Sequence, residues 1–77
     1  IKQDFVTMET LYAQTTNNGF QLINTKPAVV YQLLKTNLKE VFVLKARNGV
    51  FYKKGTHWIA EYYENNQLIQ KEYLVNF

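Results

Sequence analysis

The sequence predicts a small α+β domain in which one helix packs on one face of an antiparallel meander sheet of four to five strands. Residues 40–77 alternate apolar and polar positions between turn signals, and residues 24–37 show a helix-like apolar spacing after a proline. A composition of 47% hydrophobic and 16% aromatic residues is typical of a folded chain. Because 77 residues suffice for one domain and no linker or repeat is visible, we expect a single domain over residues 1–77.

The first two turns of the meander follow from short glycine-containing signals. The dipeptide at 48–49, Asn-Gly, favours a two-residue hairpin turn, which would place Ala46 opposite Phe51. A second turn at 54–55, Lys-Gly, would place Phe51 opposite Trp58. Residues 41–64 are therefore expected to form three strands of an antiparallel sheet.

A third turn, Asn-Asn at 65–66, would place Tyr62 opposite Ile69 and Trp58 opposite Tyr73. The three registers agree with one another, and a slip of one residue would send each apolar set to the wrong face. Together they predict one core face. This face consists of Phe42, Leu44, Ala46, Phe51, Trp58, Ala60, Tyr62, Ile69, Tyr73, Val75 and Phe77.

The helix is expected in the segment NTKPAVVYQLLKTN, residues 24–37. Asn24 or Thr25 can cap its first turn, and Pro27 is tolerated there because its missing N–H needs no partner. The apolar stripe of this helix would face the sheet. It consists of Val30, Tyr31, Leu33, Leu34 and Leu38.

The N-terminal part of the chain allows two interpretations. A strand precedes the predicted helix at residues 19–25, after a turn at 17–19. Residues 4–16 fit a strand with Val6, Met8 and Tyr12 on one face, and they also fit a helix capped by Asp4. The resulting element order is similar to that of cystatin-like or monellin-like domains, a likeness of architecture that carries no function.

The second face of the predicted sheet mixes charges with more apolar surface than a solvent face requires. An exposed apolar patch on a soluble domain usually marks an interface. Two other interpretations are that the N-terminal segment covers this face, and that its branched and aromatic residues serve β-propensity alone. The face consists of Val41, Val43, Lys45, Arg47, Val50, Tyr52, Lys54, His57, Ile59, Glu61, Tyr63, Leu68, Gln70, Glu72 and Leu74.

We therefore predict a non-catalytic protein-interaction or assembly module, such as a small accessory or inhibitor-like domain. It would bind a protein partner, or a second copy of itself as a homodimer, through the exposed sheet face. Tyr and Arg are frequent at interface hot spots, and basic and acidic strands can match across a two-fold axis. The candidate partner-binding residues are Val43, Lys45, Arg47, Val50, Tyr52, His57, Ile59 and Tyr63.

The alternative prediction is single-stranded nucleic-acid binding through the basic and aromatic strands at residues 43–54. Six of the nine cations fall within residues 35–54, and Lys45, Arg47 and Tyr52 alternate onto one face. In sheet-based binders, cations contact phosphates and aromatic rings stack on bases. A net charge of +3 supplies only part of the electrostatic footprint of such a domain.

No catalytic, metal-ligating or cofactor-binding residue is predicted. His57, Glu61 and Glu72 share the second face, but a flat face offers no pocket that excludes water and no nucleophile beside a base. One histidine and no cysteine exclude a zinc tetrad and a disulfide framework. No apolar run is long enough to cross a bilayer, and a chain that begins with Ile1 fits a removed leader and a shortened chain equally, which leaves the compartment unassigned.

Overall fold

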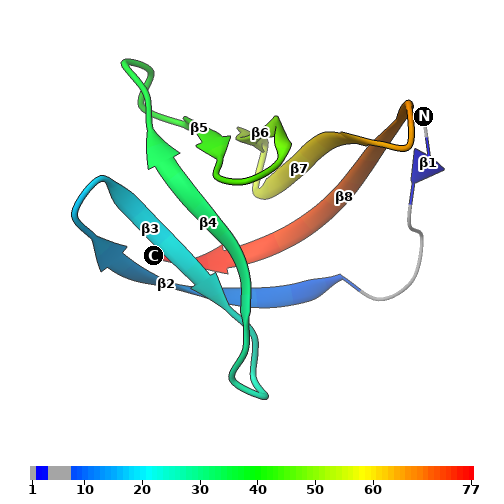
Figure 1. Ribbon diagram of the computed structural model, residues 1–77. Coiled ribbons are helices and arrows are strands. Elements are labelled where there is room, and N and C mark those ends of the chain that lie inside the picture. The colour runs from blue at the N-terminus through cyan, green and yellow to red at the C-terminus, as the bar shows by residue number, and fades with distance from the viewer. Residues whose placement is uncertain (1, 4–7) are drawn as a thin grey trace.

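The chain folds into a closed seven-stranded β-barrel, with no helix among residues 2–3 and 8–77, which this computed structural model describes (Figure 1). Strands β2 to β8 pair in sequence order, and β8 then pairs with β2 and closes the ring. The short strand β1 lies parallel to β8. The strands are β1 (Lys2–Gln3), β2 (Glu9–Thr16), β3 (Gly19–Ile23), β4 (Val29–Lys35), β5 (Val41–Leu44), β6 (Asn48–Lys54), β7 (His57–Glu64) and β8 (Gln67–Asn76).

Closure of the barrel depends on one parallel pairing. Strands β2 to β8 form six consecutive antiparallel pairs. Strands β2 and β8 instead run side by side in the same direction, with Leu11 opposite Val75. A closed barrel has no free strand edge, and each strand points alternate side chains into the interior and outward to the surface. Any recognition surface must therefore be built from outward side chains or from the barrel ends.

The barrel interior is filled by leucines and aromatic rings. Its largest fully buried side chains are Phe51, Leu11, Leu22, Leu33 and Leu44. Phe51 stacks on Trp58 with ring centroids 5.5 Å apart. Near one end, the Phe77 ring centroid lies 5.0 Å from that of Trp58 and 5.1 Å from that of Phe20. The Phe77 ring therefore covers the core, although 54% of the residue surface is exposed.

The predicted helix at 24–37, and with it the α+β fold and the cystatin-like or monellin-like element order, is wrong. Asn24 instead organises a loop, because its Oδ1 accepts hydrogen bonds from the backbone N–H groups of Lys26 (3.0 Å) and Ala28 (2.8 Å). Strand β4 follows this loop. Two adjacent valines and a tyrosine favour extended backbone, and in a strand Tyr31 and Leu33 both point into the core.

The registers of the meander are partly as predicted. Tyr62 lies opposite Ile69 and Trp58 opposite Tyr73, which confirms the third hairpin. Asn65 and Asn66 form its turn with φ of 52° and 63°, the left-handed values that asparagine tolerates.

The first two hairpins are shifted relative to the prediction. Phe51 pairs with Phe42 rather than Ala46 on one side, and with Ala60 rather than Trp58 on the other. The first turn lies at residues 45–47, where Ala46 has φ 65°. Both shifts move the pairing partner by an even number of residues. Outside the turn, each residue therefore stays on the inward or outward face that the sequence predicted for it.

The N-terminal segment is a strand over Glu9–Thr16, and the turn before Gly19 is present. Leu11, fully buried, supplies its core contact, whereas Tyr12 points outward and is 39% exposed. Residues 4–7 of this prediction lie outside the described residues.

Candidate binding surfaces

Six apolar side chains adjoin one another on the outside of strands β4 to β7, and we call them the outer patch. Leu34 lies opposite Val43, and Val43 in turn lies opposite Val50. In the next row Tyr52 lies between Val41 and Ile59. The outer patch consists of Leu34, Val41, Val43, Val50, Tyr52 and Ile59.

The outer patch is only partly covered by its own polar neighbours. Val43 is 41% exposed, whereas Ile59, between Tyr52 and Glu72 in register, is 2% exposed although its neighbours Trp58 and Ala60 on β7 point inward. The interior of the barrel is already filled without these side chains. Apart from the buried Ile59, folding therefore does not account for their apolar character beyond the β-propensity of Val and Tyr.

A polar network borders the outer patch on β7 and β8. The Tyr52 hydroxyl donates to Glu61 Oε1 at 3.0 Å, and Gln70 Nε2 donates to the same oxygen at 2.9 Å. Burial, followed by the hydrogen bond to Glu61, raises the pKa of Tyr52 above its usual value of 10. Because this change in pKa favours the protonated form, the Tyr52 hydroxyl is a neutral donor at physiological pH.

His57 forms the second polar contact of this border. Its Nδ1 lies 3.3 Å from Glu72 Oε2. Lys54 lies opposite His57 and is exposed. A histidine and a carboxylate can exchange a proton, but catalysis also needs a substrate pocket, and neither hollow described below includes His57.

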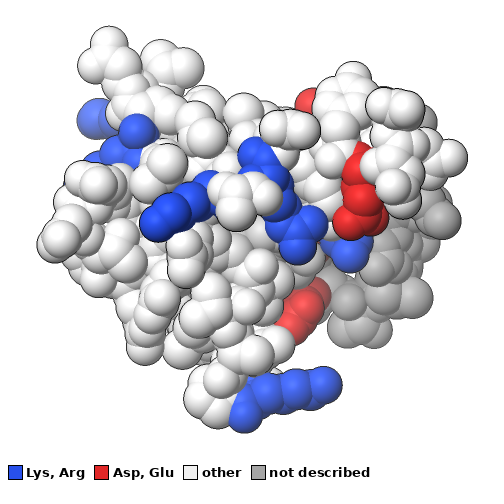
Figure 2. Space-filling view, in the orientation of Figure 1, with Lys and Arg blue, Asp and Glu red and all other residues white. Residues whose placement is uncertain are grey.

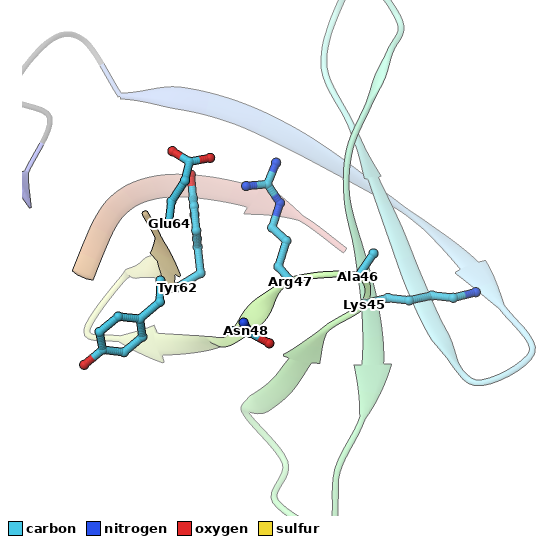
Figure 3. A pocket seen from close by; sticks show the side chains of 7 residues that line it. Lys45, Ala46, Arg47, Asn48, Tyr62 and Glu64 are labelled. Atoms are coloured by element: carbon cyan, nitrogen blue, oxygen red, sulfur yellow. The ribbon is translucent and has the colours of Figure 1, made fainter. Parts of the chain in front are cut away.

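A second surface lies at one end of the barrel, where the β5–β6 turn meets the end of β7. An open hollow of about 520 Å³ lies between them (Figure 3). We call it the barrel-end hollow. It is lined by Lys45, Ala46, Arg47, Asn48, Tyr62, Tyr63 and Glu64.

Arg47 lies over a platform of tyrosine rings at this end. Its guanidinium carbon is 4.6 Å from the Tyr62 ring centroid and 5.4 Å from that of Tyr31, both within the range of a cation–π contact. The Tyr31 and Tyr73 hydroxyls share a hydrogen bond of 2.9 Å inside the barrel. Burial first, and then this hydrogen bond, raises the pKa of Tyr31 above its usual range, so the buried pair stays neutral.

Basic side chains are spread over the face that carries the barrel-end hollow, with fewer acidic ones near them (Figure 2). Lys45 extends away from Arg47 and Glu64 (Figure 3). It also lines a smaller hollow of about 310 Å³ with Phe20, Gln32 and Leu34.

The structure divides the predicted partner-binding residues between these surfaces. Val43, Val50, Tyr52 and Ile59 adjoin one another in the outer patch, with His57 at its border. The other three line the barrel-end hollow, and they are Lys45, Arg47 and Tyr63.

Several contributing residues were not among the predicted candidates. Leu34 was assigned to the helix, and only its register in β4 brings it beside Val43. Tyr31 and Tyr62 were assigned to the core, where they are 5% and 4% exposed, yet their rings also carry Arg47. No local sequence signal distinguishes a core tyrosine from one that supports a surface arginine.

Other kinds of site find little support in the described part of the chain. Residues 2–3 and 8–77 contain no group of three His, Asp or Glu side chains placed to hold a metal ion. None of the residues described forms a helix with the length and hydropathy needed to span a membrane. No family model, curated protein or solved structure matches the chain, so both surfaces are interpreted from their own geometry.

Proposed function

We propose that this chain is a non-catalytic interaction module that docks on a protein partner through the outer patch. The observation that carries this proposal is the register itself. Val43 and Val50, and likewise Val41 and Tyr52, lie opposite one another on the outside of a barrel whose interior is filled by other residues. An apolar centre with a polar border is the usual anatomy of a protein interface.

The charges around the outer patch favour a partner with an acidic border over a second copy of this chain. Glu61 accepts hydrogen bonds from Tyr52 and Gln70, and Glu72 is held by His57, so both carboxylates are engaged within the chain. Lys54 forms no ion pair within the described residues. The side chain that remains available for pairing is therefore basic.

The homodimer predicted from sequence would pair Lys45 and Arg47 of one copy with Glu61 and Glu72 of the other. Arg47 instead lies over Tyr31 and Tyr62 at the barrel end, away from this border. The predicted pairing between two copies would therefore lack one of its two cations. We infer that a hetero-partner, apolar at its centre and acidic at its rim, matches the outer patch better.

Site-specific photo-crosslinking tests this proposal. A photoreactive residue replaces Val43 in the outer patch or, as a matched control, Val29, which is 50% exposed at the start of β4. In cells that naturally express the chain, we expect an adduct from position 43 that position 29 does not form. The charge reversal Lys54→Glu should weaken that adduct, because it places an acidic residue against an acidic rim.

The possible outcomes separate the alternatives. Equal adducts from positions 43 and 29, or none from either, would refute docking through the outer patch. An adduct of twice the chain mass would show self-association and would contradict the hetero-partner. An adduct unaffected by Lys54→Glu would contradict the acidic rim while leaving the apolar centre as the contact.

Single-stranded nucleic-acid binding through residues 43–54 receives less support. That interpretation places Lys45, Arg47 and Tyr52 on one face. In the structure Tyr52 lies in the outer patch with its hydroxyl bound to Glu61, whereas Arg47 and Lys45 line the barrel-end hollow. The basic and aromatic groups are therefore split between two surfaces rather than arranged along one strand-binding groove.

A further inference from the structure

The barrel-end hollow lies apart from the outer patch and has features of a small-ligand site. The turn at 45–47 forms one wall and the end of β7 forms the other. A volume of about 520 Å³ is within the usual range for a small-molecule cleft. Docking through the outer patch does not use this hollow, and the side chains that line the hollow indicate a separate role.

Arg47 is held in place without any anionic partner from the chain. Its guanidinium lies over the rings of Tyr62 and Tyr31, and it forms no ion pair or side-chain hydrogen bond within the described residues. Tyrosine rings contact the face of a guanidinium, whereas its five N–H groups point outward from its edges. The donors of Arg47 are therefore available to a ligand.

The tyrosine platform beneath Arg47 is fixed by the barrel. Tyr31 and Tyr62 are 5% and 4% exposed, their ring centroids are 6.4 Å apart, and the Tyr31 hydroxyl is bonded to Tyr73. An arginine that rests on immobile rings loses little conformational entropy when it binds. The planar fork of such a side chain is suited to two parallel hydrogen bonds with a carboxylate or a phosphate.

The other walls of the hollow indicate what else the ligand carries. Tyr63 lines the hollow and is 59% exposed, so its ring is accessible to a ligand. Glu64 points in the same direction as Arg47 (Figure 3), so its charge opposes any anion in the hollow, and an extended polyanion more than a single anionic group. Lys45 extends away from both (Figure 3). One anionic group beside a flat ring fits this arrangement better than a run of phosphates.

We propose that the barrel-end hollow binds a small ligand in which a phosphate or carboxylate group, held by Arg47, adjoins a flat ring that stacks on Tyr63. The bound group exchanges water for the N–H donors of Arg47, and no bond is made or broken. This site is independent of the outer patch. Its failure and the failure of protein docking are thus separate results.

An NMR titration of the full chain tests the proposal with defined probes. Phenyl phosphate and benzoate carry the two anionic groups on a ring, inorganic phosphate and acetate lack the ring, and a short single-stranded oligonucleotide represents the polyanion. We expect saturable amide shifts at residues 45–48 and 62–64 with the ring-bearing anions. Whichever of phenyl phosphate and benzoate binds more tightly identifies the anionic group.

Four variants separate specific binding by the Arg47 guanidinium from general electrostatic attraction and from stacking on Tyr63. Arg47→Gln should weaken binding of phenyl phosphate at least about tenfold, and Arg47→Lys should do so nearly as much, because an ammonium keeps the charge but lacks the fork. Lys54→Gln removes the same charge from the border of the outer patch and should leave the affinity unchanged. Tyr63→Ser should weaken phenyl phosphate but not inorganic phosphate.

Three results would overturn the proposal. The first is the absence of saturable shifts with the wild-type chain. The second is equal weakening by Arg47→Gln and Lys54→Gln, which would indicate general electrostatic attraction. The third is tighter binding of the oligonucleotide than of phenyl phosphate with a steep salt dependence, which would show a nucleic-acid surface. Thermal unfolding of each variant, measured alongside, excludes loss of the fold as the cause, and Arg47→Lys provides a second reading if Arg47→Gln does not fold.

Discussion

Gly49 is predicted to tolerate no side chain, although it does not have a left-handed backbone. It lies within β6 opposite Tyr62, and only Gly55 among the glycines has a positive φ. A Cβ added at Gly49 would lie 2.6 Å from Tyr62 Cα and would also overlap the carbonyl oxygen of Glu61. Ordinary contact begins at 3.4 Å, so the backbone of β7 would have to withdraw by at least about 0.8 Å at Tyr62 Cα and by more at the Glu61 carbonyl.

The loss of stability caused by this displacement depends on which atoms must move, and here they are backbone atoms of β7. Overpacking usually costs about 1–3 kcal/mol, and a clash with backbone belongs at the upper end because no rotamer change relieves it. We expect Gly49→Asn to lower the free energy of unfolding by about 3 kcal/mol. A chain of this size has a total stability of only about 4–12 kcal/mol, so the loss is a large part of it.

Gly55→Asn is the matched control. Gly55 has φ 65°, and nothing lies within 4 Å of an added Cβ. Asparagine accepts such a backbone, as Asn65 and Asn66 do with φ of 52° and 63°. We expect Gly55→Asn to change the stability by less than about 0.5 kcal/mol, the usual range for surface substitutions.

Urea unfolding monitored by Trp58 fluorescence measures both variants, since Trp58 is 8% exposed in the fold and becomes hydrated on unfolding. The midpoint should move at constant slope, which reports stability rather than a change in the exposed surface. If Asn48-Gly49 were the turn that the sequence suggests, asparagine would be tolerated at position 49 as well. Equal, small effects of the two substitutions would therefore refute the pairing of Gly49 with Tyr62.

Three further predictions concern the barrel interior and its ends. Tyr73→Phe should destabilise the fold by about 1–3 kcal/mol, because it leaves the buried Tyr31 hydroxyl without its partner. Burial raises the pKa of Tyr31 above 10 in the folded chain, so above about pH 10 this phenol ionises in the unfolded chain but not in the folded one. The thermal midpoint should therefore fall as pH rises above about 10, and Tyr31→Phe should make that fall less steep. Phe77→Ala should cost about 1–2 kcal/mol and shift Trp58 emission to the red, whereas Leu38→Ala, at a residue 63% exposed, should do neither.

Each of these predictions has a contrary outcome. A neutral Tyr73→Phe would mean that the Tyr31 hydroxyl finds another partner or water. A midpoint that falls equally above pH 10 in wild type and Tyr31→Phe would assign the alkaline transition to other groups. Unchanged emission in Phe77→Ala would mean that the Phe77 ring does not cover Trp58 in solution.

The helix at 24–37 was predicted because two periodicities coincide there. Val30, Tyr31, Leu33 and Leu34 form a stripe at helical spacing, and they equally form alternate faces of a strand. The discriminating residue is Leu38, which the helix would bury and which is 63% exposed in the structure. What decides the outcome is tertiary: β4 must pair with both β3 and β5 for the ring to close.

The faces of the meander were more predictable than its registers. Turn preferences suggested Asn48-Gly49, yet the chain turns at Ala46 with φ 65° and accepts a strain of roughly 1–2 kcal/mol there. This places Gly49 where β6 and β7 approach too closely for any side chain. The shift is even, so the outer patch was largely predictable, whereas the position of Arg47 in the turn was not.

The closed ring explains why the two surfaces are a patch and an end rather than an edge. An open sheet has edge strands to which a partner can add a strand, whereas here β8 already pairs with β1, β2 and β7. Recognition must then depend on side chains that the interior does not use. Strand β6 supplies residues to both surfaces: Val50 and Tyr52 point outward into the patch, and Asn48, at the start of the strand, lines the hollow with Arg47. Since Gly49 lies between them, a substitution that separates β6 from β7 should weaken both proposed binding functions together, whereas Val43→Asp and Arg47→Gln should each affect only one.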